Sequence, residues 1–259
     1  MLALTATQVT PAANTSTTLG KPSLGFVENA GQWSPEASFL LRGVGQDLWI
    51  SPGEARLDLY DPRAPAGGGQ VIGLSFVGAK GTFRPGRKLA HRISWIEGSE
   101  GTPLRYQSAA FSTVANDNAY RGIDILWMLT AEGPRFDLVV KPGADPSQIA
   151  LRVSGQFGDF ENVGESVRFN TRYGPATLGK LVASQVGNTG SKNIACKFVK
   201  IAPHTIGLSL GNYDRSKPLL IDPTIFATYF GAGRGDAIND IDPGSDGSLL
   251  FAGSSRSTD

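Results

Sequence analysis

Residues 123–146 read IDILWMLTAEGPRFDLVVKPGADP, and this stretch decides the fold class. Ile123 to Thr130 is a nearly continuous apolar run, and Arg135 to Val140 is a second run that follows a Gly-Pro pair. Short apolar runs bounded by turn residues are typical of β-strands inside a sheet. Lys141 to Pro146 then consists of turn residues, because proline fixes φ and glycine accepts positive φ. The stretch therefore predicts a central β-hairpin followed by a tight turn.

The same pattern of short apolar runs and turns extends outward over most of the chain. Ala55 to Tyr60 alternates at period two, with Leu57 and Leu59 on one face, as a half-buried strand does. The 33 glycines and 16 prolines are spread along the sequence, which favours many short strands joined by turns. Further strands are expected within 38–44, 47–51, 71–77, 92–97, 104–114, 149–153, 166–170, 192–201 and 205–210.

No segment of a dozen residues shows the apolar spacing of an amphipathic helix. We therefore predict an all-β, β-sandwich-like domain over residues 24–223, which can divide into lobes at 24–140 and 141–223. Residues 1–23 are rich in small polar residues and are expected to form a disordered leader or the remnant of a signal peptide.

The tail changes character after Pro223, where short apolar strands alternate with Gly/Asp turns. This pattern is typical of one β-propeller blade. Because a single blade cannot bury its own faces, residues 224–259 are predicted to be a partial repeat that further repeats follow.

Composition excludes several classes of function. The net charge is +1 with no block of like charge, which argues against nucleic-acid partners and against anionic membranes. No apolar run approaches the roughly 20 residues that span a bilayer. The lone Cys196 excludes an intrachain disulfide, and its alternation with Ile194 and Phe198 predicts a buried core thiol.

Four segments occur in a fixed order: FVENAGQW at 26–33, YRGIDI at 120–125, FDLVVKPGADP at 136–146 and YDRSKPLLIDP at 213–223. Together they resemble the N-terminal domain, of unassigned function, of bacterial SBBP-repeat (seven-bladed β-propeller repeat) proteins. The tail from Thr228 resembles the first repeat of that family. The resemblance implies an exported, cell-surface protein built of repeats, and it supplies no catalytic residues.

The two histidines carry no sign of a metal site. Neither His91 nor His204 has a His, Cys or carboxylate at ligand spacing, so a structural or surface role is expected for each. Calcium prefers oxygen ligands, and an acidic cluster in the tail offers several, although in no EF-hand spacing. Whether the acidic turn 236–246 binds calcium is left open. The cluster comprises Asp236, Asn239, Asp240, Asp242 and Asp246.

The carboxylates show no catalytic pairing. The sequence has no nucleophile elbow, no phosphate loop and no dinucleotide fingerprint. Asp124 and Asp137 lie within the predicted hairpin, where they are expected to face solvent or to pair with Arg121 or Arg135. Glycoside hydrolysis needs two paired carboxylates, and nothing in the sequence marks two as partners. The other candidates are Glu28, Glu54 and Asp58. We therefore predict no catalytic, cofactor-binding or metal-binding residues and no cofactor.

The four tryptophans offer one binding chemistry, because aromatic faces stack on the apolar faces of sugar rings. Each tryptophan lies in a hydrophobic strand or beside a turn, so packing in the core is the default expectation. They are Trp33, Trp49, Trp95 and Trp127.

The sequence thus favours a non-catalytic structural or interaction module of a secreted or cell-surface bacterial protein. It would present the downstream propeller repeats and bind an unidentified protein or glycan. The alternative is a secreted carbohydrate-active protein, either a glycan-binding domain or a hydrolase with carboxylates from distant strands. Two carboxylates about 5–9 Å apart in a concave, aromatic-lined cleft would favour the hydrolase.

Overall fold

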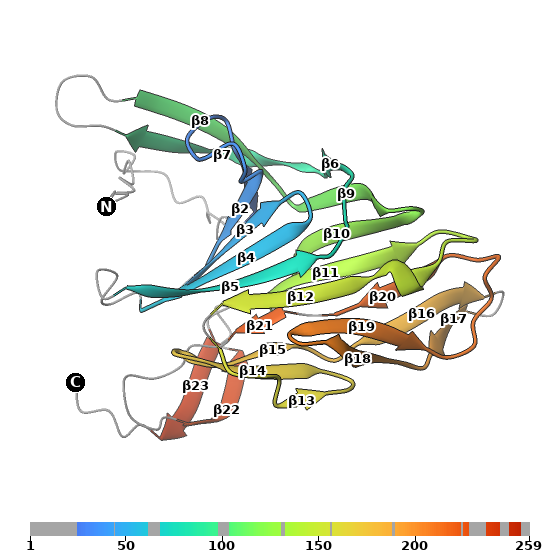
Figure 1. Ribbon diagram of the computed structural model, residues 1–259. Helices are drawn as coiled ribbons and strands as arrows, with labels where there is room; N and C mark the ends of the chain where they lie inside the picture. The colour runs from blue at the N-terminus through green and yellow to red at the C-terminus, as the bar shows by residue number, and fades with distance from the viewer. Residues whose placement is uncertain are drawn as a thin grey trace.

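The computed structural model describes residues 25–43, 45–61, 68–97, 104–130, 133–155, 157–187, 190–223, 225–227, 237–243 and 249–254. Over these residues the chain is all-β, apart from one 3-10 turn at Pro146–Gln148 (η2) (Figure 1). Two antiparallel sheets of 10 and 7 strands form a sandwich, which confirms the predicted fold class. The predicted leader, residues 1–23, lies outside the described residues.

The larger sheet has the strand order β18-β19-β12-β5-β4-β3-β2-β1-β8-β7, and all its pairs are antiparallel. In Figure 1 the β7–β8 hairpin at its edge extends away from the other strands. Its strands are β1 (Phe26–Glu28), β2 (Phe39–Arg42), β3 (Gln46–Ser51), β4 (Glu54–Tyr60), β5 (Gly69–Phe76), β7 (Lys88–Glu97), β8 (Leu104–Phe111), β12 (Ala150–Gly155), β18 (Cys196–Ala202) and β19 (Thr205–Leu210).

The second sheet has the order β17-β16-β20-β11-β10-β9-β6. Its centre is the predicted hairpin, in which Ile123 pairs with Val140 and Trp127 pairs with Phe136. Its strands are β6 (Thr82–Pro85), β9 (Thr113–Tyr120), β10 (Ile123–Thr130), β11 (Gly133–Val140), β16 (Val182–Gly187), β17 (Gly190–Ile194) and β20 (Leu219–Asp222).

Two smaller sheets complete the described chain. Phe169 and Leu178 of the third sheet pack against Leu57 and Leu74 of the large sheet, around an apolar cavity of about 30 Å³. The third sheet comprises β13 (Asn162–Val163), β14 (Val167–Thr171), β15 (Gly174–Leu178) and β21 (Ile225–Ala227). In the tail, β22 (Ala237–Pro243) pairs with β23 (Leu249–Ser254) as a separate hairpin.

A single apolar core joins the main sheets. Phe76 of the large sheet meets Phe136 and Trp127 of the second sheet with ring centroids 5.1 and 5.8 Å apart, both edge-on. Backbone pairing also crosses the suggested lobe boundary, since β12 pairs with β5 and β20 pairs with β11. The two suggested lobes, 24–140 and 141–223, therefore share backbone hydrogen bonds and one apolar core.

Three of the four segments noted in the sequence meet at one end of the sandwich. Lys141 N–H donates to the Gly122 carbonyl at 2.9 Å, and Gly143 N–H donates to the Arg215 carbonyl at 2.8 Å. Gly122 has φ of +75°, and a Cβ there would lie 2.9 Å from the Ala144 methyl group. A glycine is required at this turn because both its φ and its space exclude a side chain.

The core seam gives a direct test of the architecture. Phe136 is 0% exposed and contacts both Phe76 and Trp127, so Phe136→Ala should lower the free energy of unfolding by about 3–5 kcal/mol. Val186→Ala, at a side chain that is 79% exposed, should change it by less than about 0.5 kcal/mol. Urea denaturation measures both, and equal effects would contradict the assigned core.

Candidate functional site

The outer face of the large sheet, between β1 and β5, carries an unusual set of side chains. In β3, Leu48 and Ile50 point into the core, so the alternate residues Asp47, Trp49 and Ser51 point outward. In the adjacent strand β4, Asp58 lies directly opposite Asp47. Likewise Arg56 lies opposite Trp49, and Glu54 opposite Ser51. These outward residues form the floor of the site.

The loop between β1 and β2 lies over this floor and is organised by Asn29. Its amide nitrogen donates to the carbonyl oxygens of Ser34 at 2.9 Å, Ala37 at 2.8 Å and Trp33 at 3.3 Å. Its amide oxygen accepts from Gly31 N–H at 2.9 Å. The side-chain amide of Asn29 thus satisfies several backbone groups that the turn would otherwise leave unpaired.

Gln32 and Glu28 tie the same loop to strand β8. The Gln32 amide donates to the Ser108 hydroxyl at 2.8 Å and to the Glu28 carbonyl at 2.9 Å. The Glu28 carboxylate accepts from Ala109 N–H at 3.0 Å. Glu28, a candidate carboxylate in the sequence, is therefore part of the scaffold that presents Trp33.

Three of the four tryptophans meet on this face. Trp33 lies between Trp49 and Trp95, with both ring centroids 5.1 Å away and interplanar angles of 84° and 81°. The Arg42 guanidinium lies 5.4 Å from the Trp95 ring centroid, within range of a cation–π contact. Trp33 and Trp95 also pack on a small apolar cluster separate from the main core. We call these three residues the tryptophan triad.

An open cleft of about 400 Å³ lies beside the triad, and Trp33 and Trp49 are among its walls. Polar side chains complete it, chiefly Glu54 and Arg56 of β4, which form an ion pair with 3.9 Å between the Arg56 guanidinium and Glu54 Oε1. Gly73 of β5 leaves room for this pair, since a Cβ there would lie 3.1 Å from Glu54 Oε1. The cleft volume falls within the roughly 300–1,000 Å³ typical of small-molecule sites.

Asp58 holds Trp49 in place. The Trp49 indole N–H donates to Asp58 Oδ2 at 2.8 Å, while Asp58 Oδ1 is buried and finds no hydrogen-bond partner among the described residues. Burial raises the pKa of the Asp58 carboxyl, and the Trp49 hydrogen bond only partly opposes the increase. Neither carboxylate oxygen is presented freely to the cleft.

Asp47 forms a second outward polar group on the same face. It is 7% exposed, pairs with Arg42 at 3.4 Å and accepts from the Tyr60 hydroxyl at 3.5 Å. Burial raises the pKa of the Asp47 carboxyl, with Arg42 acting in the opposite direction. Arg42 thereby links Asp47 to Trp95 of the triad.

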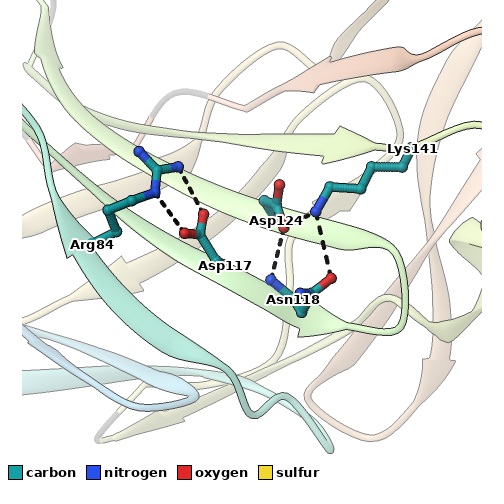
Figure 2. A network of polar contacts seen from close by, with 5 residues as sticks. All are labelled: Arg84, Asp117, Asn118, Asp124 and Lys141. Atoms are coloured by element: carbon teal, nitrogen blue, oxygen red, sulfur yellow. Dashed lines mark hydrogen bonds and ion pairs between the residues drawn. The ribbon is translucent and has the colours of Figure 1, made fainter.

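The hairpin carboxylates are held in ion pairs on the second sheet. Figure 2 shows Asp124 accepting from Lys141 Nζ at 2.8 Å and from Asn118 N–H at 2.7 Å. Beside it, Arg84 binds Asp117 through two hydrogen bonds of 2.6 and 2.8 Å. Asp124 therefore pairs with Lys141 instead of Arg121, because Asp124 and Lys141 occupy neighbouring strand ends.

Asp137 pairs with Arg135 as expected, at 2.7 Å, and Arg135 also contacts Asp222 at 3.0 Å. Asp137 is 3% exposed, so this ion pair neutralises a buried charge. The structure brings neither Asp124 nor Asp137 to the cleft.

The two histidines and the cysteine lie outside the cleft, in contacts that are typical of structural residues. His204 adopts φ of 54° and its ring lies 5.0 Å from the Phe157 ring, while His91 is partly buried in β7. Cys196 is partly buried instead of fully buried, and its thiol lies 3.3 Å from the Leu181 carbonyl. Burial raises the pKa of the Cys196 thiol, which disfavours the reactive thiolate.

Over the described residues, no group of three His, Cys, Asp or Glu side chains is placed to hold a metal ion. Asp236 and Asp246 of the acidic turn 236–246 lie outside the described residues. Among the described elements, no helix is long and apolar enough to cross a membrane.

A second hollow of about 290 Å³ lies between η2 and the loop after β19. Its Asp145 carboxylate accepts from the Ser147 hydroxyl at 2.7 Å and from Ser147 N–H at 3.0 Å, which lowers the pKa of Asp145. Asp145 is thereby committed to capping the turn. The wall of this hollow contains one aromatic residue, Tyr213, and no group of aromatic rings like the tryptophan triad.

The tryptophan triad is the feature that the sequence did not predict. Trp127 is buried in the core as expected, at 2% exposure, but the other three are partly buried on the outer face. A signal was available for Trp49, because it alternates with the inward Leu48 and Ile50. Nothing local places Trp33 or Trp95 beside it, since three separate segments meet there.

The fold and the site define an all-β sandwich domain with an aromatic cleft on one outer face. The chain belongs to the family described as a domain of unknown function, DUF7948, whose model matches residues 26–224. No curated protein and no solved structure matches the chain. The family match covers the region of the four segments, but none of these comparisons links the chain to SBBP repeats.

The role of Asn29 can be tested by truncation. Asn29→Ala removes the donor that satisfies three loop carbonyls, so the free energy of unfolding should fall by about 1–3 kcal/mol. The near-ultraviolet circular dichroism of the tryptophans should weaken as Trp33 loses its fixed position. Asn212→Ala, at an exposed asparagine, serves as the control and should change neither quantity. An unchanged tryptophan spectrum in Asn29→Ala would refute the organising role.

The raised pKa of Asp58 predicts a pH-dependent stability difference. A folded-state pKa above the unfolded value means that wild-type protein loses stability as pH rises through the folded pKa. Asp58→Asn lacks this loss and can still accept the Trp49 hydrogen bond. The free energy of unfolding of Asp58→Asn, relative to that of the wild type, should therefore increase from about pH 3 to pH 7.

Asp117→Asn is the control of opposite sign. Arg84 lowers the pKa of Asp117, so the wild-type protein gains stability from this pair as pH rises. At neutral pH the free energy of unfolding of Asp117→Asn should therefore be lower than that of the wild type. Denaturant titrations at several pH values measure both differences. Parallel pH profiles for Asp58→Asn and wild type would show that the pKa of Asp58 is not raised in the folded protein.

Proposed function

We propose that this chain is a non-catalytic interaction module of an exported bacterial surface protein. One observation carries the proposal: an open cleft of about 400 Å³ with two tryptophan walls on an exposed sheet face. Contiguous apolar surface that is rimmed by polar residues marks binding sites and ligand grooves on protein surfaces. Export, a cell-surface location and downstream SBBP-type propeller repeats are part of the same proposal and rest on the resemblance of the four segments.

The hydrogen-bonding state of the carboxylates supports binding over catalysis. A general acid or base must be within hydrogen-bond reach of the proton that it transfers. One oxygen of Asp58 accepts a hydrogen bond from Trp49, and the other is buried. Asp47 forms an ion pair with Arg42 and accepts a hydrogen bond from Tyr60. Each group is positioned to support a neighbouring side chain.

The second candidate is a secreted glycoside hydrolase, which one specific observation favours. Glu36, Glu54 and Asp58 all border the cleft, and a raised pKa such as that of Asp58 suits a general acid. Glu54 and Asp58 are four positions apart on one strand, which separates their Cα atoms by about 13 Å at about 3.3 Å per residue. Glycosidases place their two carboxyl groups roughly 5–9.5 Å apart, so both side chains would have to lean toward each other along the strand to reach that range.

A sedimentation experiment separates binding from hydrolysis. The folded chain is mixed with the protein and the polysaccharide fractions of a bacterial cell envelope, in separate tubes. We expect at least one fraction to remove the chain from solution, without release of new reducing ends. Trp49→Ala should weaken the removal at least tenfold, whereas Arg84→Ala, on the second sheet, should not.

Two outcomes would overturn the proposal. Failure of both fractions to remove the chain would exclude an interaction module for envelope material. Release of reducing ends that Glu54→Gln or Asp58→Asn abolishes would identify a hydrolase instead.

A further inference from the structure

The chemistry of the cleft also specifies a class of ligand, and this step rests on the interaction function proposed above. We infer that the cleft between the loop 29–37 and strands β3–β5 binds an uncharged glycan, with a sugar ring against Trp33 and Trp49. The inference uses the aromatic walls, the donors and acceptors around them, and the charge balance of the cleft.

The walls of the cleft are rigid. Trp33 is wedged between Trp49 and Trp95, and its loop is fixed by Asn29. Trp49 is fixed by the hydrogen bond from its indole N–H to Asp58. Because the indole N–H is already used, Trp49 offers its ring rather than its donor to a ligand. An indole ring that is held in place offers a preorganised apolar surface to the apolar face of a pyranose ring.

The polar groups suit hydroxyls. Arg56 offers only donors and Glu54 only acceptors, and their side chains are 56% and 37% exposed. A sugar hydroxyl both donates and accepts, so neighbouring hydroxyls can use both side chains at once. An ammonium group only donates and is repelled by Arg56, whereas a carboxylate or phosphate only accepts and is repelled by Glu54.

The charge balance points the same way. Glu36, Glu54 and Asp58 against Arg56 give the cleft borders an acidic excess, which disfavours uronic acids, sialic acids and phosphorylated glycans. A polyamine or basic peptide would satisfy the excess but would compete with Arg56 for the Glu54 carboxylate. A neutral oligosaccharide satisfies the aromatic walls and both signs of side chain.

The test is an array of neutral, acidic and amine-bearing oligosaccharides probed with the full chain, followed by calorimetry on the tightest binder. Neutral glycans should bind, and Trp49→Ala and Arg56→Ala should each weaken binding at least tenfold. Arg56 is exposed, so its variant keeps the fold if Trp49→Ala does not. Arg84→Ala and Tyr173→Ala are the matched controls for lost charge and lost aromatic area, and both should bind as wild type does.

Nuclear magnetic resonance adds a readout of position. On addition of the neutral glycan, the indole N–H resonances of Trp33 and Trp49 should shift, and that of the core residue Trp127 should not. Binding of only acidic or amine-bearing glycans, or neutral binding that is insensitive to Trp49 and Arg56, overturns the inference. Failure to bind any glycan also overturns it, and removal by the envelope protein fraction would then leave the interaction function standing.

Discussion

The edge-on contact of Phe76 with Phe136 and Trp127 fixes which side of each main sheet is inside. Side chains alternate across a strand, so a shift of one residue in register would exchange the two faces of a strand. With Leu48, Ile50 and Leu57 committed to the core, Trp49, Arg56 and Asp58 have no alternative to the outer face. The candidate site is therefore a consequence of how the core is packed.

Much of the strand pattern could be predicted from the sequence, because one-sided burial leaves a period-two signature. The hairpin at 123–140 and the alternation at 55–60 are examples that the structure confirms. Two segments that were each expected to form one strand form two strands in the structure. The run 104–114 divides at Ser112 between β8 and β9, and the run 192–201 divides at Ala195 between β17 and β18. Both breaks move the chain from one main sheet to the other without Gly or Pro.

Strand β6 was missed for the opposite reason. Thr82–Pro85 lies in a segment rich in glycine, proline and basic residues that resembles a turn. It is an edge strand paired only with β9, and an edge strand tolerates proline because one side makes no ladder hydrogen bonds. The site was harder still, since Trp33, Trp49 and Trp95 come from a loop and two strands. Only the strand order brings them together, and no local pattern encodes that order.

The Asp58 side chain connects the stability of the fold to the proposed binding surface. A partly buried carboxyl with a raised pKa weakens the folded state at neutral pH, and a well-packed apolar residue would be less costly at that position. What Asp58 provides is the acceptor that fixes the Trp49 indole. An indole without it could rotate, and ordering it would then reduce the affinity for any ligand. The same destabilising charge thus keeps the aromatic wall in a fixed position before the ligand arrives. A sugar face interacts only weakly with an indole ring, so its affinity depends on this ordering being already in place.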